Sequence, residues 1–280
     1  MSDLFRAEVL NQALPYIQQF QDQTFVVKYG GSAMKDPTLM SAVIRNVLLL
    51  DLIGIRVVLV HGGGPEIDYW LNRLGIEKLV KHGLRVTDDA TMEVVEMALA
   101  GRANKALVAE IQKAGGRAVG LSGRDADLLQ AHPIEELGRT GTVVNVDPGI
   151  LRTLSAAEYI PVVCSVATSP DHEALNVNAD IAAGAIAGAL RANKLILLTD
   201  TDGVLEDHRD PATRISNLSP QKAKEMLASG QADRGMIPKL EGALDALNHG
   251  VQRVHLINGS RENSLLIEIF TDHGIGTMME

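Results

Sequence analysis

The chain has 280 residues, 46% of them hydrophobic, with a formal net charge of −9 from 26 basic and 35 acidic residues. This length allows one large α/β domain or two smaller ones with a sizeable core. The negative charge and the 3% of aromatic residues argue against a general nucleic-acid-binding protein. The single cysteine, Cys164, excludes an intrachain disulfide and a zinc site built from several thiolates.

The N-terminal segment predicts a helix over residues 4–21. Apolar residues recur there at helical spacing: Leu4, Ala7, Leu10, Leu14 and Ile17. Pro15 interrupts this pattern and should kink the helix. The segment does not have the basic start and apolar core of a secretory signal, and no apolar run reaches the roughly 20 residues that span a bilayer. We therefore expect a cytoplasmic protein that does not bind membranes.

Strands and helices alternate along the rest of the chain. Apolar and β-branched runs predict strands over residues 24–29, 55–60, 117–121, 160–166, 194–200 and 253–258. Helical spacing predicts helices over residues 37–52, from 65 onward, and over 89–114, 179–190, 219–229, 236–248 and 265–270. Turns and a short apolar run within residues 122–148 predict a hairpin excursion. The alternation indicates a mostly parallel sheet with helices on both faces, in which ligands bind beyond the carboxyl ends of the strands.

Two glycine-rich turns follow predicted strands at that edge. Gly30-Gly31 follows the first strand, and Gly62-Gly63-Gly64 follows the second. Such turns expose backbone N–H groups and let an anion approach closely, although either turn alone is equally compatible with tight packing. None of the ten lysines follows a glycine and no GxGxxG spacing occurs here, so neither a P-loop nor a dinucleotide fingerprint is present. The two turns together favour a phosphate or carboxylate site.

Polar residues also follow later strands. The segment NVNAD at residues 176–180 begins a helix of small residues, where one polar residue would suffice as an N-cap. TDTDGV at residues 199–204 fits either a turn or a nucleotide contact. Lys239 lies near the start of a predicted helix, where a single lysine is usually a solvent-exposed surface residue. The sequence carries no HExxH or similar cluster, so we predict no metal site made of protein ligands.

Seven motifs, in this order, resemble those of the amino acid kinase family: KYGGSAM, VHGGGPEI, HGLRVTD, ALAGRANK, LNVNAD, LLTDTDGV and GMIPKL. They cover the chain from about residue 24 onward, and HGLRVTD points to the branch that phosphorylates N-acetyl-L-glutamate. The resemblance implies a single domain over residues 1–280, a three-layer αβα sandwich with a central, mainly parallel sheet. It further implies an oligomerisation helix (1–23), a lobe for N-acetylglutamate (24–192) and a lobe for ATP and arginine (193–280).

The implied reaction is the ATP-dependent phosphorylation of the side-chain carboxylate of N-acetyl-L-glutamate in arginine biosynthesis, with Mg²⁺ carried by ATP. By resemblance, the residues that act on the transferred phosphoryl group are Lys28, Lys239 and Asp180. Those expected to bind the acceptor are Gly63, Gly64, Arg85, Asn176 and Asn178. Those expected on the ATP side are Gly30, Gly31, Thr199, Asp200 and Gly203.

The resemblance also extends to regulation. It implies inhibition by L-arginine bound at His255, Glu268 and Gly274, and a hexamer formed as a trimer of dimers through the N-terminal helix. In some photosynthetic organisms the signalling protein PII relieves such inhibition. Two alternatives remain open: another kinase of the family acting on aspartate or glutamate, or a non-catalytic arginine or nitrogen sensor on the same fold. The presence of both lysines and the aspartate favours an active enzyme.

Overall fold

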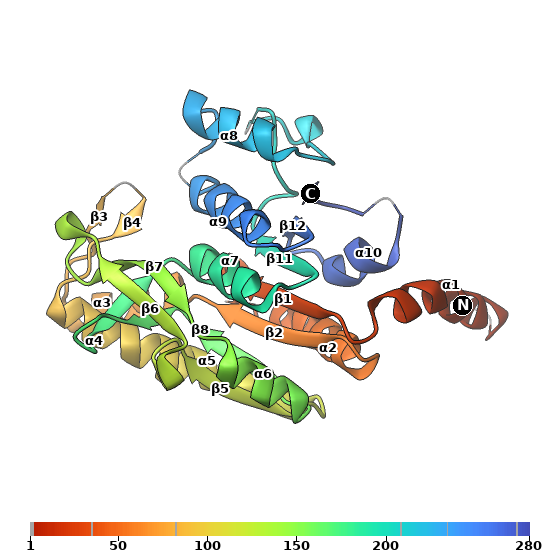
Figure 1. The fold of residues 1–280 in the computed structure, drawn as a ribbon, viewed down its shortest axis with the longest axis horizontal. Helices are drawn as coiled ribbons and strands as arrows, with labels where there is room; N and C mark the ends of the chain where they lie inside the picture. The colour runs from red at the N-terminus through yellow and green to blue at the C-terminus, as the bar shows by residue number, and fades with distance from the viewer. Residues whose placement is uncertain (1–2, 35, 82, 208, 234, 273) are drawn as a thin grey trace.

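A computed structural model describes residues 3–280 except 35, 82, 208, 234 and 273, so His82 of the HGLRVTD motif lies outside the described residues. A seven-stranded sheet lies between two layers of helices (Figure 1). Its strand order is β13-β12-β11-β1-β2-β8-β5, and the neighbouring strands are parallel except for β12 and β13. The αβα sandwich with a mainly parallel sheet is thereby confirmed.

The strands of the large sheet are β1 (Thr24–Tyr29), β2 (Arg56–His61), β5 (Ala118–Ser122), β8 (Ile160–Cys164), β11 (Lys194–Thr199), β12 (Arg253–Asn258) and β13 (Thr277–Met279). The α-helices are α1 (Asp3–Phe20), α2 (Pro37–Leu52), α3 (Gly64–Leu74), α4 (Asp89–Glu96), α5 (Asn104–Lys113), α6 (Gly149–Ala156), α7 (Ala179–Leu190), α8 (Pro220–Ser229), α9 (Ile237–Asn248) and α10 (Ser264–Phe270). A small barrel consists of β6 (Leu129–Pro133), β7 (Thr140–Val146), β9 (Val166–Thr168) and β10 (Ala174–Val177). β3 (Val80–Lys81) and β4 (Leu84–Arg85) form a separate hairpin.

The alternation of side chains along β1 builds both faces of the sheet. Phe25 and Val27 pack in the core shared with α2, α5 and α10, whereas Val26 packs in the core shared with α7 and α9. Because successive side chains of a strand point to opposite faces, Lys28 shares the face of Val26. Lys28 therefore reaches the α7 and α9 layer at the carboxyl end of its strand, where these two helices begin.

Two of the predicted elements are divided in the structure. The helix predicted over residues 89–114 consists of α4, the π-helix η2 (Met97–Ala103) and α5, because its middle turn is wound more widely. The strand predicted over residues 160–166 is divided at Ser165, where the chain leaves the sheet and enters the barrel. The predicted hairpin excursion is confirmed as the antiparallel pair of β6 and β7.

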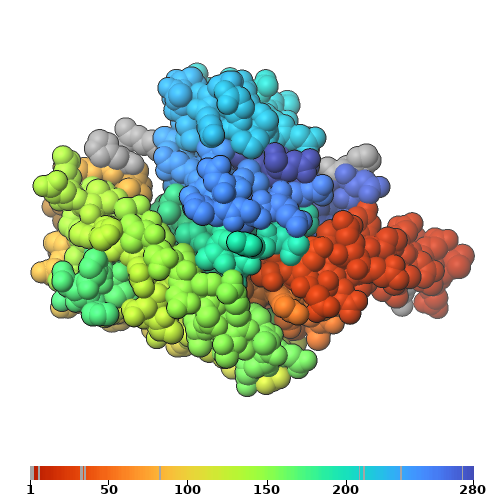
Figure 2. All heavy atoms as spheres, viewed as in Figure 1, coloured from red at the N-terminus to blue at the C-terminus, as the bar shows by residue number. Residues whose placement is uncertain are grey.

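The N-terminal helix extends from the side of the molecule (Figures 1 and 2). α1 continues through Pro15, and its distal leucines Leu4 and Leu10 are 72% and 71% exposed. Only its end packs on the chain, where Tyr16 meets Phe270 of α10 edge-on. The leucines of the predicted apolar stripe (Leu4, Leu10 and Leu14) are therefore left exposed by the described residues, whereas Ile17 is half-buried. Among those residues, no helix combines the length and the apolarity needed to cross a membrane.

Candidate functional site

A cavity of about 280 Å³ lies at the carboxyl ends of β1 and β2, beside the start of α7. Both glycine turns and the HGLRVTD and NVNAD segments reach it. The predicted site residues that line it are Lys28, Gly30, Gly31, Gly63, Gly64, Arg85, Asn176, Asn178 and Asp180. The fold thus brings together residues that are up to 152 positions apart in the chain (from 28 to 180).

Two lysines converge on one carboxylate at this cavity. Lys28 Nζ lies 3.0 Å from Asp180 Oδ1, and Lys239 Nζ donates to Asp180 Oδ2 at 2.8 Å. Lys28 comes from β1, Asp180 from the first turn of α7 and Lys239 from the first turn of α9. The positive ends of two helix dipoles therefore point toward the same place as the two ammonium groups. This arrangement is suited to an anion that needs charge from two sides.

Burial sets the electrostatics of this triad. Burial lowers the pKa of Lys28, and the nearby Lys239 lowers it further, while Asp180 opposes both effects. Burial alone would raise the pKa of Asp180, but the two lysines outweigh it and hold that pKa below its ordinary value. Two lysine side chains therefore share the charge of Asp180, and the Asp200 carboxylate also acts on Lys28. An anionic phosphoryl group that enters between the two lysines would be stabilised by both of them.

Close contact with a neighbouring side chain explains one glycine in each of the two turns. A Cβ at Gly31, which has φ +73°, would lie 2.8 Å from Asp200 Oδ1, and a Cβ at Gly63 would lie 2.5 Å from Leu99 Cδ2. Within the described part of the chain, the N–H groups of Gly63 and Gly64 donate to no other backbone group. Both residues line the cavity, so two N–H groups without a backbone partner at the start of α3 are available to an anion there.

Arg85 is fixed in the cavity wall before any ligand binds. Its Nη2 donates to Asp68, which also accepts from Lys78 Nζ at 2.8 Å. Its Nη1 is buried and has no hydrogen-bond partner among the described residues. Because an unsatisfied buried guanidinium N–H is costly, Nη1 is the obvious donor for a ligand carboxylate. Sequence reasoning missed Asp68, which lies in α3 as an ordinary helix residue.

The two asparagines of NVNAD differ in their contacts. Asn176 Nδ2 donates to Thr87 Oγ1 at 3.1 Å, and Thr87 in turn contacts Thr140 Oγ1 at 2.8 Å. Asn178 accepts from the backbone N–H of Asp180 at 2.8 Å and is the N-cap of α7. Asn178 therefore orients the helix that carries Asp180, and both asparagines also line the cavity.

The predicted ATP-side residues of the C-terminal half lie at the carboxyl end of β11. Thr199 Oγ1 donates to Thr201 O at 2.7 Å and closes a tight turn. Asp200 packs against Gly31, and Gly203 lines a small separate cavity of about 40 Å³ with Met226 and Met236. In the described part of the chain, no group of three or more His, Cys, Asp and Glu side chains is placed to hold a metal ion.

A second polar cluster lies on the other side of the C-terminal half. His255 Nδ1 lies 2.7 Å from Glu268 Oε1, and His255 Nε2 lies 3.0 Å from Lys194 Nζ. Glu268 Oε2 also accepts from the backbone N–H groups of Ile275 and Gly276. A Cβ at Gly274 would lie 2.7 Å from the same oxygen, so the chain passes directly over this carboxylate.

The charges of this cluster are unusual for a protein core. Burial lowers the pKa of Lys194 to about 8, with Arg253 adding to the effect. Burial likewise lowers the pKa of His255, although Glu268 opposes it. The ring therefore stays neutral, donating to Glu268 and accepting from Lys194. Lys194 was missed from the sequence, although a lysine that opens a fully buried strand was a visible signal.

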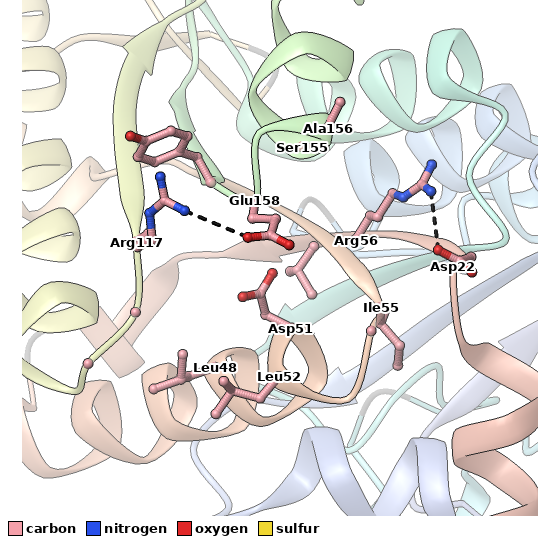
Figure 3. A pocket seen from close by; sticks show the side chains of 15 residues that line it. Asp22, Leu48, Asp51, Leu52, Ile55, Arg56, Arg117, Ser155, Ala156 and Glu158 are labelled. Atoms are coloured by element: carbon pink, nitrogen blue, oxygen red, sulfur yellow. Dashed lines mark hydrogen bonds and ion pairs between the residues drawn. The ribbon is translucent and has the colours of Figure 1, made fainter.

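A larger cavity, of about 510 Å³, lies at the opposite, amino ends of the strands (Figure 3). Its arginines are already paired, Arg56 with Asp22 at 3.2 Å and Arg117 with Glu158 at 3.8 Å. It contains neither the glycine turns nor the lysines. The chemistry of the lining residues, rather than volume, therefore identifies the smaller cavity as the candidate active site.

Comparison with known proteins agrees with this geometry. Residues 23–258 match the model of the amino acid kinase family. A protein of Nostoc sp. named acetylglutamate kinase is 54% identical over 276 residues, which is 98% of this chain and 93% of that protein. The structure resembles N-acetylglutamate synthase from Neisseria gonorrhoeae complexed with coenzyme A and N-acetyl-glutamate, with a TM-score of 0.85 and 28% identity over 98% of this chain. It also resembles a complex of that synthase with coenzyme A and L-arginine, with a TM-score of 0.81 and 26% identity over 98% of this chain. This chain spans only 63% and 65% of the two synthase chains.

Proposed function

This chain belongs to the amino acid kinase family, and on that basis we propose that it transfers the γ-phosphoryl group of ATP to the side-chain carboxylate of N-acetyl-L-glutamate. The observation that carries the proposal is the convergence of Lys28 and Lys239 on Asp180, beside two glycine turns and a buried arginine. The name of the Nostoc relative and the ligand of the synthase structure support the choice of acceptor.

The chemistry needs positioning and charge rather than a base. A free carboxyl group with a pKa of about 4.3 is already ionised at neutral pH, so no residue has to remove a proton. The obstacle is repulsion between the carboxylate and the triphosphate, while charge spreads over the transferring phosphoryl group. Lys28 and Lys239 stabilise that charge, and Asp180 keeps both ammonium groups aimed at it.

The acceptor and ATP are held by different parts of the site. Gly63 and Gly64 donate backbone N–H groups to the reacting carboxylate of the acceptor. Arg85 Nη1 donates to its α-carboxylate. Asn176 and Asn178 contact the other polar groups of the acceptor. The lobe of residues 24–192 holds this acceptor. ATP binds the lobe of residues 193–280 near Thr199, Asp200 and Gly203, with Gly30 and Gly31 at its phosphates.

Mg²⁺ is expected to arrive with ATP. Magnesium keeps several waters and commonly binds through substrate phosphates, with one or two carboxylates. When bound, the ion neutralises phosphate charge, and the lysines act on the remaining charge.

The choice of acceptor is tested by ADP release from ATP with N-acetylglutamate, glutamate, aspartate and carbamate as acceptors. We expect N-acetylglutamate to give at least about tenfold higher kcat/KM than each of the others, because loss of the acetamido contacts leaves polar groups unpaired. A preference for aspartate or glutamate would identify another kinase of the family. No turnover together with tight arginine binding would identify a non-catalytic sensor.

Asp68 is expected to act on acceptor binding through Arg85. The Asp68→Asn variant removes the charge that holds the guanidinium but keeps the side-chain shape. We expect KM for N-acetylglutamate to rise about 3- to 30-fold, since a charge-assisted hydrogen bond contributes about 1.5–3 kcal/mol and the amide oxygen of the asparagine can still accept a neutral one from Arg85. KM for ATP should not change. An unaltered KM for N-acetylglutamate in steady-state assays would contradict the role of Asp68.

We further propose that L-arginine inhibits the enzyme at the cluster of Lys194, His255 and Glu268, beside Gly274. Glu268 suits a guanidinium group, and the Lys194 ammonium suits an α-carboxylate. The arginine complex of the structurally similar synthase supports the ligand class. Lys194 Nζ also lies 5.3 Å from the ring centre of Phe20, at the end of α1. Arginine binding would thereby depend on the N-terminal helix.

The exposed face of α1 supports a hexamer that forms as a trimer of dimers through this helix. An uncovered apolar face this large usually marks a contact. We propose a cytoplasmic location, and the signalling protein PII as a further partner on the family resemblance alone.

Deletion of residues 1–22 is expected to convert a hexamer to a dimer, retain catalysis and weaken arginine inhibition. The deletion removes both the exposed leucines and Phe20, so a second variant separates their effects. Leu4→Glu combined with Leu10→Glu keeps Phe20 and should break the hexamer with a smaller loss of inhibition. Light scattering gives the assembly state, and arginine titration of ADP release gives the inhibition. A full-length protein that is dimeric and ignores millimolar arginine would contradict both proposals.

A further inference from the structure

The carbonyl group of Gly62 is held by the side chain just before the glycine turn. His61 ends β2, is fully buried, and places its Nδ1 2.8 Å from Gly62 O. Its other ring nitrogen, Nε2, lies 3.1 Å from Nδ2 of Asn104, which is fully buried as well. The roles proposed above for the cavity residues leave this pair unused.

The neighbours of the ring fix its tautomer. A carbonyl oxygen can only accept, so Nδ1 carries the hydrogen, and an amide nitrogen can only donate, so Nε2 presents its lone pair. The orientation of the Asn104 amide is set by Lys105, which donates to its Oδ1 at 3.1 Å, and by its Nδ2, whose two hydrogens are shared between His61 Nε2 and the carbonyl oxygens of Val162 at 2.8 Å and Leu121 at 3.2 Å. Burial lowers the pKa of His61 to about 4, although its bond to Gly62 opposes this shift. The ring is therefore neutral at pH 7.

This bond also determines the direction of the next N–H group. The described residues contain no cis peptide, and in a planar trans peptide the C=O and the following N–H point in opposite directions. Fixing the Gly62 carbonyl on His61 therefore turns the Gly63 N–H the other way. We infer that His61, held in one tautomer by Asn104, is a positioning residue that aims the Gly63 N–H at the oxygen atoms of the reacting carboxylate. The inference rests on the proposed function.

The π-helix η2 accounts for the placement of both supports. The N–H of Asn104 donates to Leu99 O, which is the hydrogen bond between residues i and i−5 that defines a π-helical turn. Leu99 packs on Gly63, where it leaves no space for a Cβ, and Asn104 packs on His61. One irregular turn thus supports the glycine turn from two directions. Single π-helical turns of this kind are frequent at functional sites.

Two amide substitutions of His61 separate positioning from packing. In His61→Asn the amide nitrogen takes the place of Nδ1 and can still donate to Gly62 O. In His61→Gln the amide lies nearer the place of Nε2 and cannot. We expect His61→Asn to keep kcat within about fivefold of wild type and His61→Gln to lose about 100-fold, because a misplacement near 1 Å costs about that much. KM for ATP should stay within about threefold in both variants, since the nucleotide side is not touched.

The inference is tested by steady-state kinetics with N-acetylglutamate and by melting curves of each variant. His249→Gln, on the surface of the chain, is the matched control and should change neither kcat nor the melting temperature. Equal kcat for the two His61 variants at similar melting temperatures would overturn the role of His61. A His61→Gln protein that does not fold would assign the residue to packing and overturn it as well. A wild type inactive toward N-acetylglutamate would instead contradict the proposed function, so the two failures are distinguishable.

Discussion

Replacement of Asp180 by asparagine is expected to lower kcat for phosphoryl transfer by about 10²- to 10³-fold, which is the cost of losing a preorganised charge-stabilising contact. The carboxylate holds Lys28 at 3.0 Å and Lys239 at 2.8 Å, so the substitution releases both ammonium groups at once. The two like charges then repel each other in a buried place, where Lys28 already has a lowered pKa. Saturating both substrates restricts the measurement to the chemical step and product release.

Stability must be measured beside activity, because removing one member of a buried ion pair costs about 3–5 kcal/mol. Asp245→Asn on the outer face of α9 is the matched control, since Asp245 contacts only the surface His249 among the described ion pairs. The control should keep full kcat. A folded Asp180→Asn protein with kcat within threefold of wild type would contradict the proposed roles of both lysines.

The second large effect is expected at Arg85. Arg85→Lys should raise KM for N-acetylglutamate about 10- to 100-fold, because one ammonium group cannot contact both Asp68 and a ligand carboxylate with the fixed geometry of a guanidinium. The buried Nη1 of Arg85, which has no partner within the described residues, is the donor that the substitution removes. KM for ATP should change less than threefold, since the proposed role of Arg85 is to bind the acceptor and not ATP.

Arg45→Lys is the matched control for this prediction. Arg45 lies on the outer face of α2, where its Nη1 donates to Ser41 Oγ at 2.9 Å. Its replacement should leave both KM values unchanged. Equal KM values for N-acetylglutamate in wild type and Arg85→Lys would remove Arg85 from the acceptor site.

Periodicity predicted the large elements because their packing is regular. The boundaries of β1, α2, α7 and β12 are those expected, since each element buries one continuous face or both faces. β3, β4 and β13 were missed because strands of two or three residues carry no readable period. The π-helical turn at Met97–Ala103 was also missed, since seven residues of the same composition fit an ordinary helix.

The candidate site was predictable as motifs but not as a network. The glycine turns and the NVNAD segment stand out by residue type and position, whereas Lys28 and Lys239 were assigned a role only by the family resemblance; the cavity gathers most of the predicted residues. Their supports do not stand out, because Asp68 and Asn104 are ordinary helix residues whose roles arise only from contacts across the fold. Those contacts join segments 17 and 43 positions apart, which no local pattern reveals.

The bond that the enzyme forms is the most direct test of the account. Phosphorylation of a carboxylate gives an acyl phosphate, which hydroxylamine converts to a hydroxamate with release of phosphate. We predict ATP-dependent hydroxamate from N-acetylglutamate with the wild type, and about 10²-fold less with folded Asp180→Asn. ATP consumption without any hydroxamate, or no consumption at all, would contradict carboxylate phosphorylation at this site.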